Sequence, residues 1–222
     1  NDAFLVKFNS SGVRQWATYY GGNGGDLGYS CATDASGNVY LAGYTLSSTG
    51  IASGGHQNTL GGGTFDAFIV KFNSSGTLQW ATYYGGTGNE YGWSCATDAS
   101  GNVYLSGYTE STAGIASGGH QNTIGGGSDA FLVKFNSSGV RQWATYYGGT
   151  GNDYSYGCAT DALGNVYLAG YAASTTGIAF GGHQNTYGGG NDAFLVKFNS
   201  SGTRQWATYY GGGSWDLPHS VW

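Results

Sequence analysis

Runs of alternating side chains with two apolar faces recur along the chain, and the run 67–72 is typical of them. Its two faces carry Phe68, Val70 and Phe72 on one side and Ala67, Ile69 and Lys71 on the other. A strand with one solvated face would alternate apolar and polar residues more cleanly. This pattern therefore predicts a strand that has neighbours both above and below it.

Four such runs make up the stretch 27–84. They are 29–33, 39–44, 66–72 and 78–84. The first pair is separated by the turn 34–38, in which an Asp that can bond its own backbone is followed by Gly. The second pair is separated by the turn 73–76, and a long polar connection over 45–64 joins the two pairs. No window keeps a 3.6-residue period, so almost no helix is expected.

The same segment is written almost four times. Its copies begin at Asp2, Asp66, Asp129 and Asp192, in steps of 64, 63 and 63 residues. A fixed period of this size indicates a repeat architecture. Units of four antiparallel strands that are covered on both faces by the next unit are the blades of a β-propeller. The predicted fold is therefore an all-β propeller, because the coils of the competing β-solenoid are usually much shorter.

The repeats divide the chain unevenly. We expect one array over 1–222, with two outer strands in 2–20, complete blades near 27–84, 91–147 and 154–210, and the start of a further blade at 215–222. Propellers close with about four to eight blades. About three complete blades with partial blades at both ends would expose a strand edge and an apolar face. The predicted partner is therefore a second copy of the chain or further repeats of a longer protein, since the chain begins inside a repeat.

The wording of the repeat resembles a known family. GNVYLAGYT, a GGHQNT segment, GGG followed by DAF and VKFNSSG, W-T-YYGG and ATDASGN are similar to the bacterial SBBP β-propeller repeat. The likeness is greatest to members from Bacteroidetes-type bacteria, and it covers nearly the whole chain. The chain departs from the family at Gly50-Ile51, Gly114-Ile115 and Gly177-Ile178, where the family often has Phe-Pro. The resemblance implies a propeller in a secreted or cell-surface protein, but no particular ligand.

Composition and charge exclude several functions. The chain has 44 Gly, 19 Tyr and 7 Trp but only 9% charged residues, and its net charge is −5. A nucleic-acid partner would need a basic face. No apolar run approaches about 18 residues, so no membrane insertion is expected. All charges except Glu110 sit at repeat positions, and no catalytic triad, HExxH or P-loop is present. A non-catalytic protein is therefore predicted.

The three cysteines share one repeat position. Cys31, Cys95 and Cys158 are in register, and Val221 stands at the same place in the last, partial copy. An apolar Val in place of Cys predicts a small buried core residue. Equivalent positions in successive repeats are also expected to be too far apart for a disulfide, which needs Cα atoms within about 7 Å.

The sharpest binding candidates lie in the long connection. They are His56, Gln57, Asn58, His120, Gln121, Asn122, His183, Gln184 and Asn185. Such side chains offer neutral donors and acceptors that suit sugar hydroxyls, and one site per blade would give multivalent binding. The structural alternative is that His and Gln pack the connection onto its blade. A lectin-like protein would expose the His residues beside an aromatic platform, whereas a structural module would bury them.

A second candidate is the acidic loop after each Gly-Gly pair. Asp26, Glu90, Asp153 and Asp216 are in register there and make calcium binding possible. One carboxylate per loop is too few for calcium unless other oxygens converge, so loop capping is the competing explanation and no cofactor is otherwise expected. Taken together, the sequence predicts a structural or adhesive repeat module that self-associates into a closed propeller, array or fibre. A multivalent carbohydrate-binding propeller is the alternative.

Overall fold

In a computed structural model of the chain, residues 1–218 and 220–221 are described, and they form fourteen β-strands. The strands are β1 (Ala3–Phe8), β2 (Arg14–Tyr20), β3 (Asp26–Thr33), β4 (Val39–Thr45), β5 (Asp66–Phe72), β6 (Leu78–Tyr84), β7 (Glu90–Thr97), β8 (Val103–Thr109), β9 (Asp129–Phe135), β10 (Arg141–Tyr147), β11 (Asp153–Thr160), β12 (Val166–Ala172), β13 (Asp192–Phe198) and β14 (Arg204–Tyr210). Within the described residues there is no helix that could cross a membrane.

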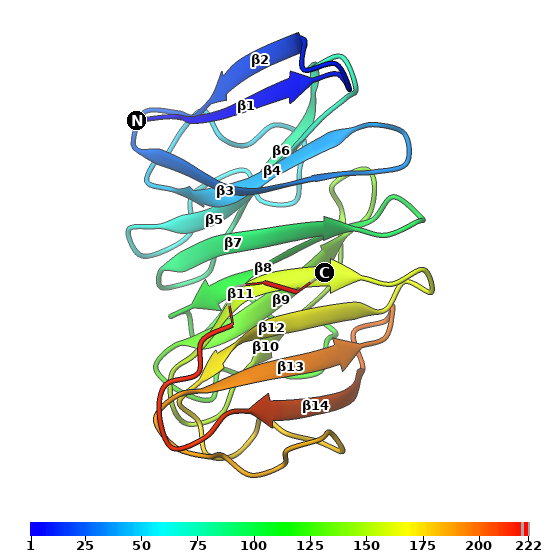
Figure 1. Cartoon of the computed structure of the whole chain (residues 1–222). Helices are drawn as coiled ribbons and strands as arrows, with labels where there is room; N and C mark the ends of the chain where they lie inside the picture. The colour runs from blue at the N-terminus through cyan, green and yellow to red at the C-terminus, as the bar shows by residue number, and fades with distance from the viewer. Residues whose placement is uncertain (219, 222) are drawn as a thin grey trace.

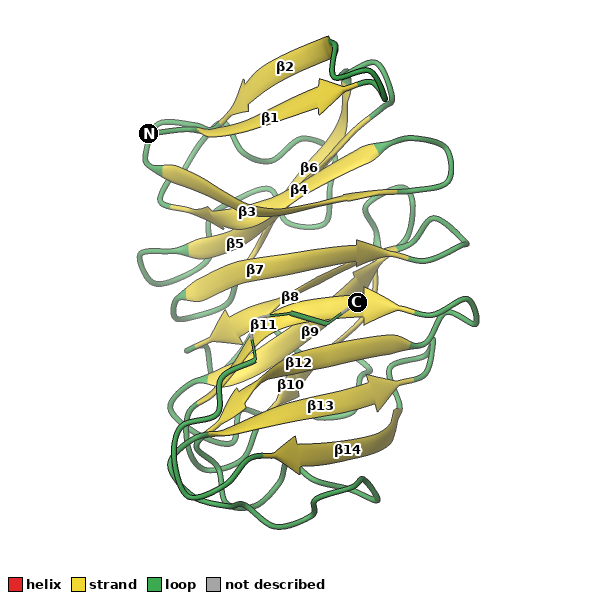
Figure 2. Ribbon diagram, viewed as in Figure 1, coloured by secondary structure: helices red, strands yellow, loops and turns green. Residues whose placement is uncertain are grey.

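The strands form one two-stranded and three four-stranded antiparallel sheets (Figures 1 and 2). The strand orders are β1-β2, β3-β4-β5-β6, β7-β8-β9-β10 and β11-β12-β13-β14, so each strand pairs with its neighbour in the sequence. The expectation of an all-β chain built from four-stranded antiparallel sheets is confirmed. Over the described residues the sheets stack as an open series from β1-β2 to β13-β14 and do not close into a ring (Figure 1).

The first strand of each blade is longer than the sequence indicated. The predicted run 29–33 belongs to β3, which begins at Asp26 because Asp26 pairs with Thr45 of β4. A β-bulge between Gly28 and Ser30 shifts the register and breaks the apolar alternation that would have announced these residues. The four-stranded sheets therefore span 26–84, 90–147 and 153–210.

The turn between the first two strands of each four-stranded sheet is fixed by one acidic side chain. The Asp34 carboxylate accepts hydrogen bonds from the backbone N–H groups of Ser36 and Asn38, both at 3.0 Å. Gly37 adopts a φ of 74°, in the left-handed region that favours glycine. This is the turn chemistry that the sequence predicted at 34–38, and the same contacts recur at Asp98 and Asp161.

The core lies between the sheets, as the two apolar faces of the run 67–72 predict. One face of β5 puts Phe68 and Val70 into a cluster with Leu5 of the preceding sheet. The other face puts Ile69 into a second cluster, together with Phe131 of the following sheet. Each inner sheet thus contributes one face to the core before it and the other face to the core after it.

Ser220 and Val221 lie beside β11, the innermost strand of the third four-stranded sheet (Figure 1). No strand is assigned to 215–218 or to 220–221, where the sequence placed the start of a further blade, and residues 219 and 222 lie outside the described residues. A Cβ added at Gly157 of β11 would come within 3.1 Å of the Val221 nitrogen. Val221 therefore continues the row of innermost strands without itself forming a ladder.

The prediction that the three cysteines are buried is wrong for one of them. All three thiols are free, and Cys95 and Cys158 are buried, but Cys31 is exposed. The backbone N–H of Cys95 donates to the Ser30 hydroxyl of β3, and that of Cys158 donates to the Ser94 hydroxyl of β7. Each buried thiol is thus covered by the innermost strand of the preceding sheet. The sheet before β3 contains only β1 and β2, so Cys31 has no such cover.

Candidate functional site at the blade junctions

The chemically distinctive side chains gather where one sheet meets the next, so the blade junction is the candidate functional site. At its apolar end, Tyr84 of β6 lies against two rings of β9, with centroids 5.6 Å from Phe131 and 5.8 Å from Phe135. The Tyr84 hydroxyl donates to the Ile115 carbonyl at 2.5 Å. The long connection that carries Ile115 is therefore tied to the sheet before it.

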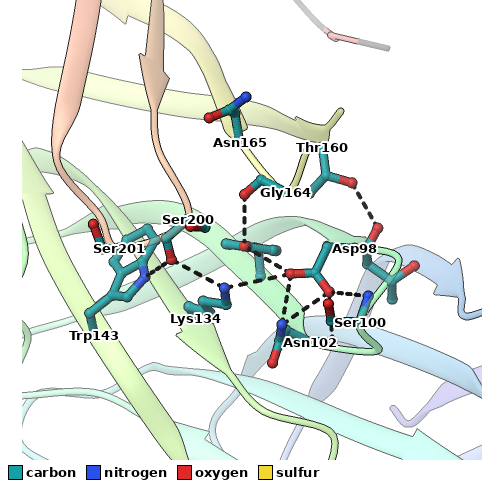
Figure 3. A network of polar contacts seen from close by, with 12 residues as sticks. Asp98, Ser100, Asn102, Lys134, Trp143, Thr160, Gly164, Asn165, Ser200 and Ser201 are labelled. Atoms are coloured by element: carbon teal, nitrogen blue, oxygen red, sulfur yellow. Dashed lines mark hydrogen bonds and ion pairs between the residues drawn. The ribbon is translucent and has the colours of Figure 1, made fainter. Parts of the chain in front are cut away.

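At the polar end of the junction, two side-chain donors of one sheet bind one carbonyl oxygen of the next sheet, as drawn in Figure 3. We call this double contact the junction lock. The Lys134 ammonium and the Trp143 indole N–H both donate to the Ser200 carbonyl of the next sheet, at 3.2 Å and 3.0 Å. The same double contact joins Lys71 and Trp80 to Ser137. This lock repeats with the fold, which is why a lysine occurs at a fixed repeat position.

The Asp98 carboxylate completes this network within its own sheet (Figure 3). It accepts hydrogen bonds from the Asn102 side chain and the Tyr104 hydroxyl, and it lies 3.5 Å from the Lys134 ammonium. Burial opposes its ionisation, but these hydrogen bonds and the nearby ammonium outweigh burial and hold the pKa of Asp98 below its usual range. The Asp98 carboxylate and the Lys134 ammonium are thus both engaged in contacts of the junction.

A pair of acidic side chains lies at each Gly-Gly turn between sheets. Asp66 accepts a hydrogen bond from the Gly61 N–H at 2.6 Å, and Glu90 accepts one from the Gly86 N–H at 2.8 Å. Both carboxyl groups are fully buried. Burial raises the pKa of Asp66 to about 6 and that of Glu90 to about 7, against opposing hydrogen bonds.

The close approach of Asp66 explains the first glycine of that turn. A Cβ at Gly85 would lie 2.3 Å from the Asp66 carboxyl carbon, so a larger residue fits only if the Asp66 side chain is displaced. The acidic loop at Glu90 was expected from the sequence, but the contribution of Asp66 from the preceding repeat was missed. The signal lay in the constant spacing of 24 residues between the two acids of every pair.

The residues considered for calcium are all used as hydrogen-bond acceptors. Asp26 accepts from the Gly22 N–H and from the Thr45 and Ser47 hydroxyls. The other three carboxylates accept the N–H of the second glycine of their own Gly-Gly pair, and they are Glu90, Asp153 and Asp216. No group of three or more His, Cys, Asp or Glu suited to a metal occurs in the described part of the chain.

The His-Gln-Asn segments divide between the sheet and the surface. The Gln57 amide donates to Asp66 and accepts from the Gly85 N–H, so this side chain binds the connection to its own sheet. His56 is exposed, with its ring 6.4 Å from Tyr84 and 6.2 Å from Phe135. Those two rings are themselves buried and offer no free face.

The equivalent segments follow the same division. Each amide nitrogen donates to the nearby Asp and each amide oxygen accepts a glycine N–H, at Gln121 and Gln184. The other six side chains are all exposed, and they are His120, His183, Asn58, Asn122, Asn185 and His56.

A groove of about 450 Å³ runs along the innermost strands β3, β7 and β11. Tyr29, Trp93 and Tyr156 line it with the three cysteines, and none of the described residues that line it is charged. The Tyr29 and Trp93 rings pack against each other at 4.3 Å, and those of Trp93 and Tyr156 at 5.7 Å. In both contacts the rings meet edge to face, at 62° and 61° between their planes.

The two ends of the stack present half-junctions. Phe4 of β1 is 68% exposed, whereas Phe68, at the same repeat position, is 0% exposed. Tyr210 of β14 is 70% exposed, whereas Tyr84 is 1% exposed. The sequence predicted that an apolar face would be exposed, but not which residues form it. Each of these positions carries the same amino acid in every repeat, and only the neighbouring sheet differs.

Comparison with known proteins agrees with a repeat architecture. A family model described as SBBP, beta-propeller repeat, matches residues 15–49 and 142–177. An uncharacterized WD repeat-containing protein of Acanthamoeba polyphaga mimivirus is 26% identical over 231 residues, covering 88% of this chain and 16% of that protein. The regulatory protein FlaEY of Caulobacter vibrioides is 29% identical over 178 residues, covering 78% of this chain and 18% of that protein.

The chain thus spans less than a fifth of the length of these relatives. The matches support a β-propeller repeat module. The relatives come from a virus and from Caulobacter, so the expected Bacteroidetes-type origin remains a prediction.

Proposed function

We propose that the chain is a non-catalytic structural or adhesive repeat module that associates with further blades of its own kind. One observation carries this proposal: residues that are buried at every internal junction are exposed at the two ends of the stack. Full burial of one large apolar side chain stabilises by about 1.5–3 kcal/mol. Several such side chains on one face form a patch of the kind that marks an interaction site.

The use made of the repeated polar groups supports a structural role. The Lys134 ammonium donates to a carbonyl of the next sheet, and the Asp98 carboxylate is paired with that ammonium. Burial raises the pKa of the Cys95 thiol, which disfavours the nucleophilic thiolate. Since reactions need different groups in different roles, side chains that are engaged identically in each repeat suit a scaffold.

Sedimentation velocity tests the proposal on the whole chain. We expect species larger than the 23.0 kDa monomer at micromolar concentration, with a weight-average mass that rises with concentration. A single 23.0 kDa species across that range would contradict self-association.

Carbohydrate binding is the second candidate, and one observation favours it. Each repeat exposes one histidine at the same repeat position, and these are His56, His120 and His183. A glycan array tests it with the chain as it stands, against the triple variant His56→Ala, His120→Ala, His183→Ala. Binding that the triple variant loses supports a lectin-like module, and an empty array for the unchanged chain contradicts one.

The proposed setting is a secreted or cell-surface bacterial protein, which follows from the resemblance of the repeat. Fractionation of the producing cells tests it. Recovery of the protein in the medium or on the cell surface is expected, and recovery in the cytoplasm alone contradicts it.

A further inference from the structure

We infer that two copies of the chain join head to tail, by docking the exposed face of β13 and β14 in one copy onto the exposed face of β1 in the other. This inference rests on the proposed self-association and specifies its interface. We call the first surface the C-terminal face, defined by Lys197, Trp206 and Tyr210. We call the second the N-terminal face, defined by Phe4, Phe8, Ser10 and Gly12.

The internal junctions show which aromatic contacts such docking would create. In each, a Tyr at the end of an outermost strand lies against two Phe residues of the next sheet. The six centroid distances lie between 5.5 and 5.8 Å, and the pairs are Tyr20 with Phe68 and Phe72, Tyr84 with Phe131 and Phe135, and Tyr147 with Phe194 and Phe198.

The two end faces carry the separated halves of this contact. Tyr210 stands at the repeat position of the three tyrosines, and Phe4 and Phe8 stand at the positions of the paired phenylalanines. Tyr210 is exposed on the last sheet, and Phe4 and Phe8 are exposed on the first. Docking the two faces would therefore reproduce, between copies, a contact that the chain already makes three times within itself.

The polar contacts of the junction also have their halves at the two ends. At the first junction, Lys7 and Trp16 donate to the Ser74 carbonyl at 3.0 Å and 3.1 Å. The corresponding donors of the C-terminal face are Lys197 and Trp206, and the corresponding carbonyl of the N-terminal face belongs to Ser10. The indole N–H and the ammonium thus have a ready acceptor on a second copy.

The backbone next to Ser10 leaves room for the incoming indole. Gly76, Gly139 and Gly202 each lie under the Trp of the preceding sheet, so that an added Cβ would come within 2.7 to 2.9 Å of that ring. At Gly12, which has the same repeat position, an added Cβ would meet nothing within 4 Å. The space that Trp143 fills over Gly202 is therefore open over Gly12.

The interface has a direction because the two faces are different surfaces. The C-terminal face supplies the tyrosine, the indole and the ammonium, whereas the N-terminal face supplies the phenylalanines and the carbonyl. A dimer in which two identical faces meet would satisfy neither set. A head-to-tail contact is heterologous, and it builds rings when its rotation closes and open chains when it does not.

A mixing experiment on full-length variants tests both the faces and the direction. Phe4→Asp blocks the N-terminal face and Tyr210→Asp blocks the C-terminal face, and both residues are exposed, so the fold is not expected to depend on them. Val140→Asp is the matched control, because Val140 is 55% exposed and lies between β9 and β10 of the middle four-stranded sheet, which carries neither end face. Circular dichroism and thermal melting confirm folding, and sedimentation velocity reports mass.

We expect each blocked variant alone to be monomeric, with association weakened roughly 30-fold or more, the effect of losing an interface hot spot. An equal mixture of the two should form dimers and nothing larger, because one intact pair of faces remains. The Val140→Asp control should assemble like the unchanged chain.

Three results would overturn the inference while leaving self-association standing. They are assembly of Tyr210→Asp alone, assembly of Phe4→Asp alone, and a mixture that stays monomeric although the unchanged chain assembles. If the unchanged chain is itself monomeric, the proposed self-association fails first and this interface fails with it.

Discussion

The ring of Tyr84 stands edge-on to the ring of Phe135, with centroids 5.8 Å apart and planes at 90°. This geometry brings the positive edge of one ring to the negative face of the other. It recurs between Tyr20 and Phe72 at 88°, so it is a property of the junction.

Truncating equivalent tyrosines should cost much more stability inside the stack than at its end. Tyr84→Ala removes a buried ring and its hydrogen bond to Ile115, so it should lower the free energy of unfolding by about 3–5 kcal/mol. Tyr210→Ala should change it by less than about 0.5 kcal/mol, because its ring is mostly exposed. Urea unfolding in a Phe4→Asp background, which keeps the chain monomeric, measures both. Equal losses for the two variants would contradict this account of the junction.

Stability should fall as pH rises through the range 4 to 7. The folded state raises the pKa of Asp66 to about 6 and that of Glu90 to about 7, so it holds protons that the unfolded chain releases near pH 4. The stability from protonating these groups is therefore fully present below about pH 4 and lost as pH rises through their folded-state pKa values. We expect the free energy of unfolding to be on the order of 1 to 3 kcal/mol lower at pH 8 than at pH 5.

Glu90→Gln separates this effect from other titrations. The amide keeps the shape of the protonated side chain and does not ionise, so the variant should lose part of the fall in stability between pH 5 and pH 8. The Asp98 carboxylate does not contribute to this fall, since its lowered pKa affects stability only at more acidic pH. A Glu90→Gln variant with an unchanged pH profile would disprove the assignment to this pair.

The indole donor of the junction lock can be removed without removing its ring. Trp143→Phe keeps an aromatic side chain over Gly202 and deletes the hydrogen bond to the Ser200 carbonyl. The expected loss is about 1 kcal/mol, or up to about 3 kcal/mol if the reduced ring leaves a gap. Trp206→Phe is the matched control, because Trp206 lies on the uncovered face, and it should cost little in the monomer. The measurement is again urea unfolding of the monomeric background.

Calcium should leave the thermal stability of the chain nearly unchanged. The Asp26 carboxylate already accepts an N–H and two hydroxyls, so a cation would have to displace these donors. We expect the Tm with calcium and with a chelator to agree within about 1 °C. A rise that saturates with calcium concentration, and that Asp26→Asn or Glu90→Gln abolishes, would instead establish the acidic loops as calcium sites.

The sequence by itself determined the repeating elements. Period-two alternation marked β5 from Asp66 to Phe72 at both of its limits, because each of its residues packs in a strand with two apolar faces. Asp34 and Gly37 marked the hairpin turn because the side-chain bond and the positive φ are local requirements. The start of β3 escaped because its bulge interrupts the alternation.

Only the tertiary structure decided which equivalent residues differ. Phe4 and Phe68 share a repeat position, and Cys31 and Cys95 share another, yet the first of each pair is exposed and the second is buried. The pairing of Asp66 with Glu90 likewise exists only once two repeats are stacked. A local pattern specifies what a side chain can pack against, but burial and pKa depend on whether a neighbouring sheet is present to exclude water.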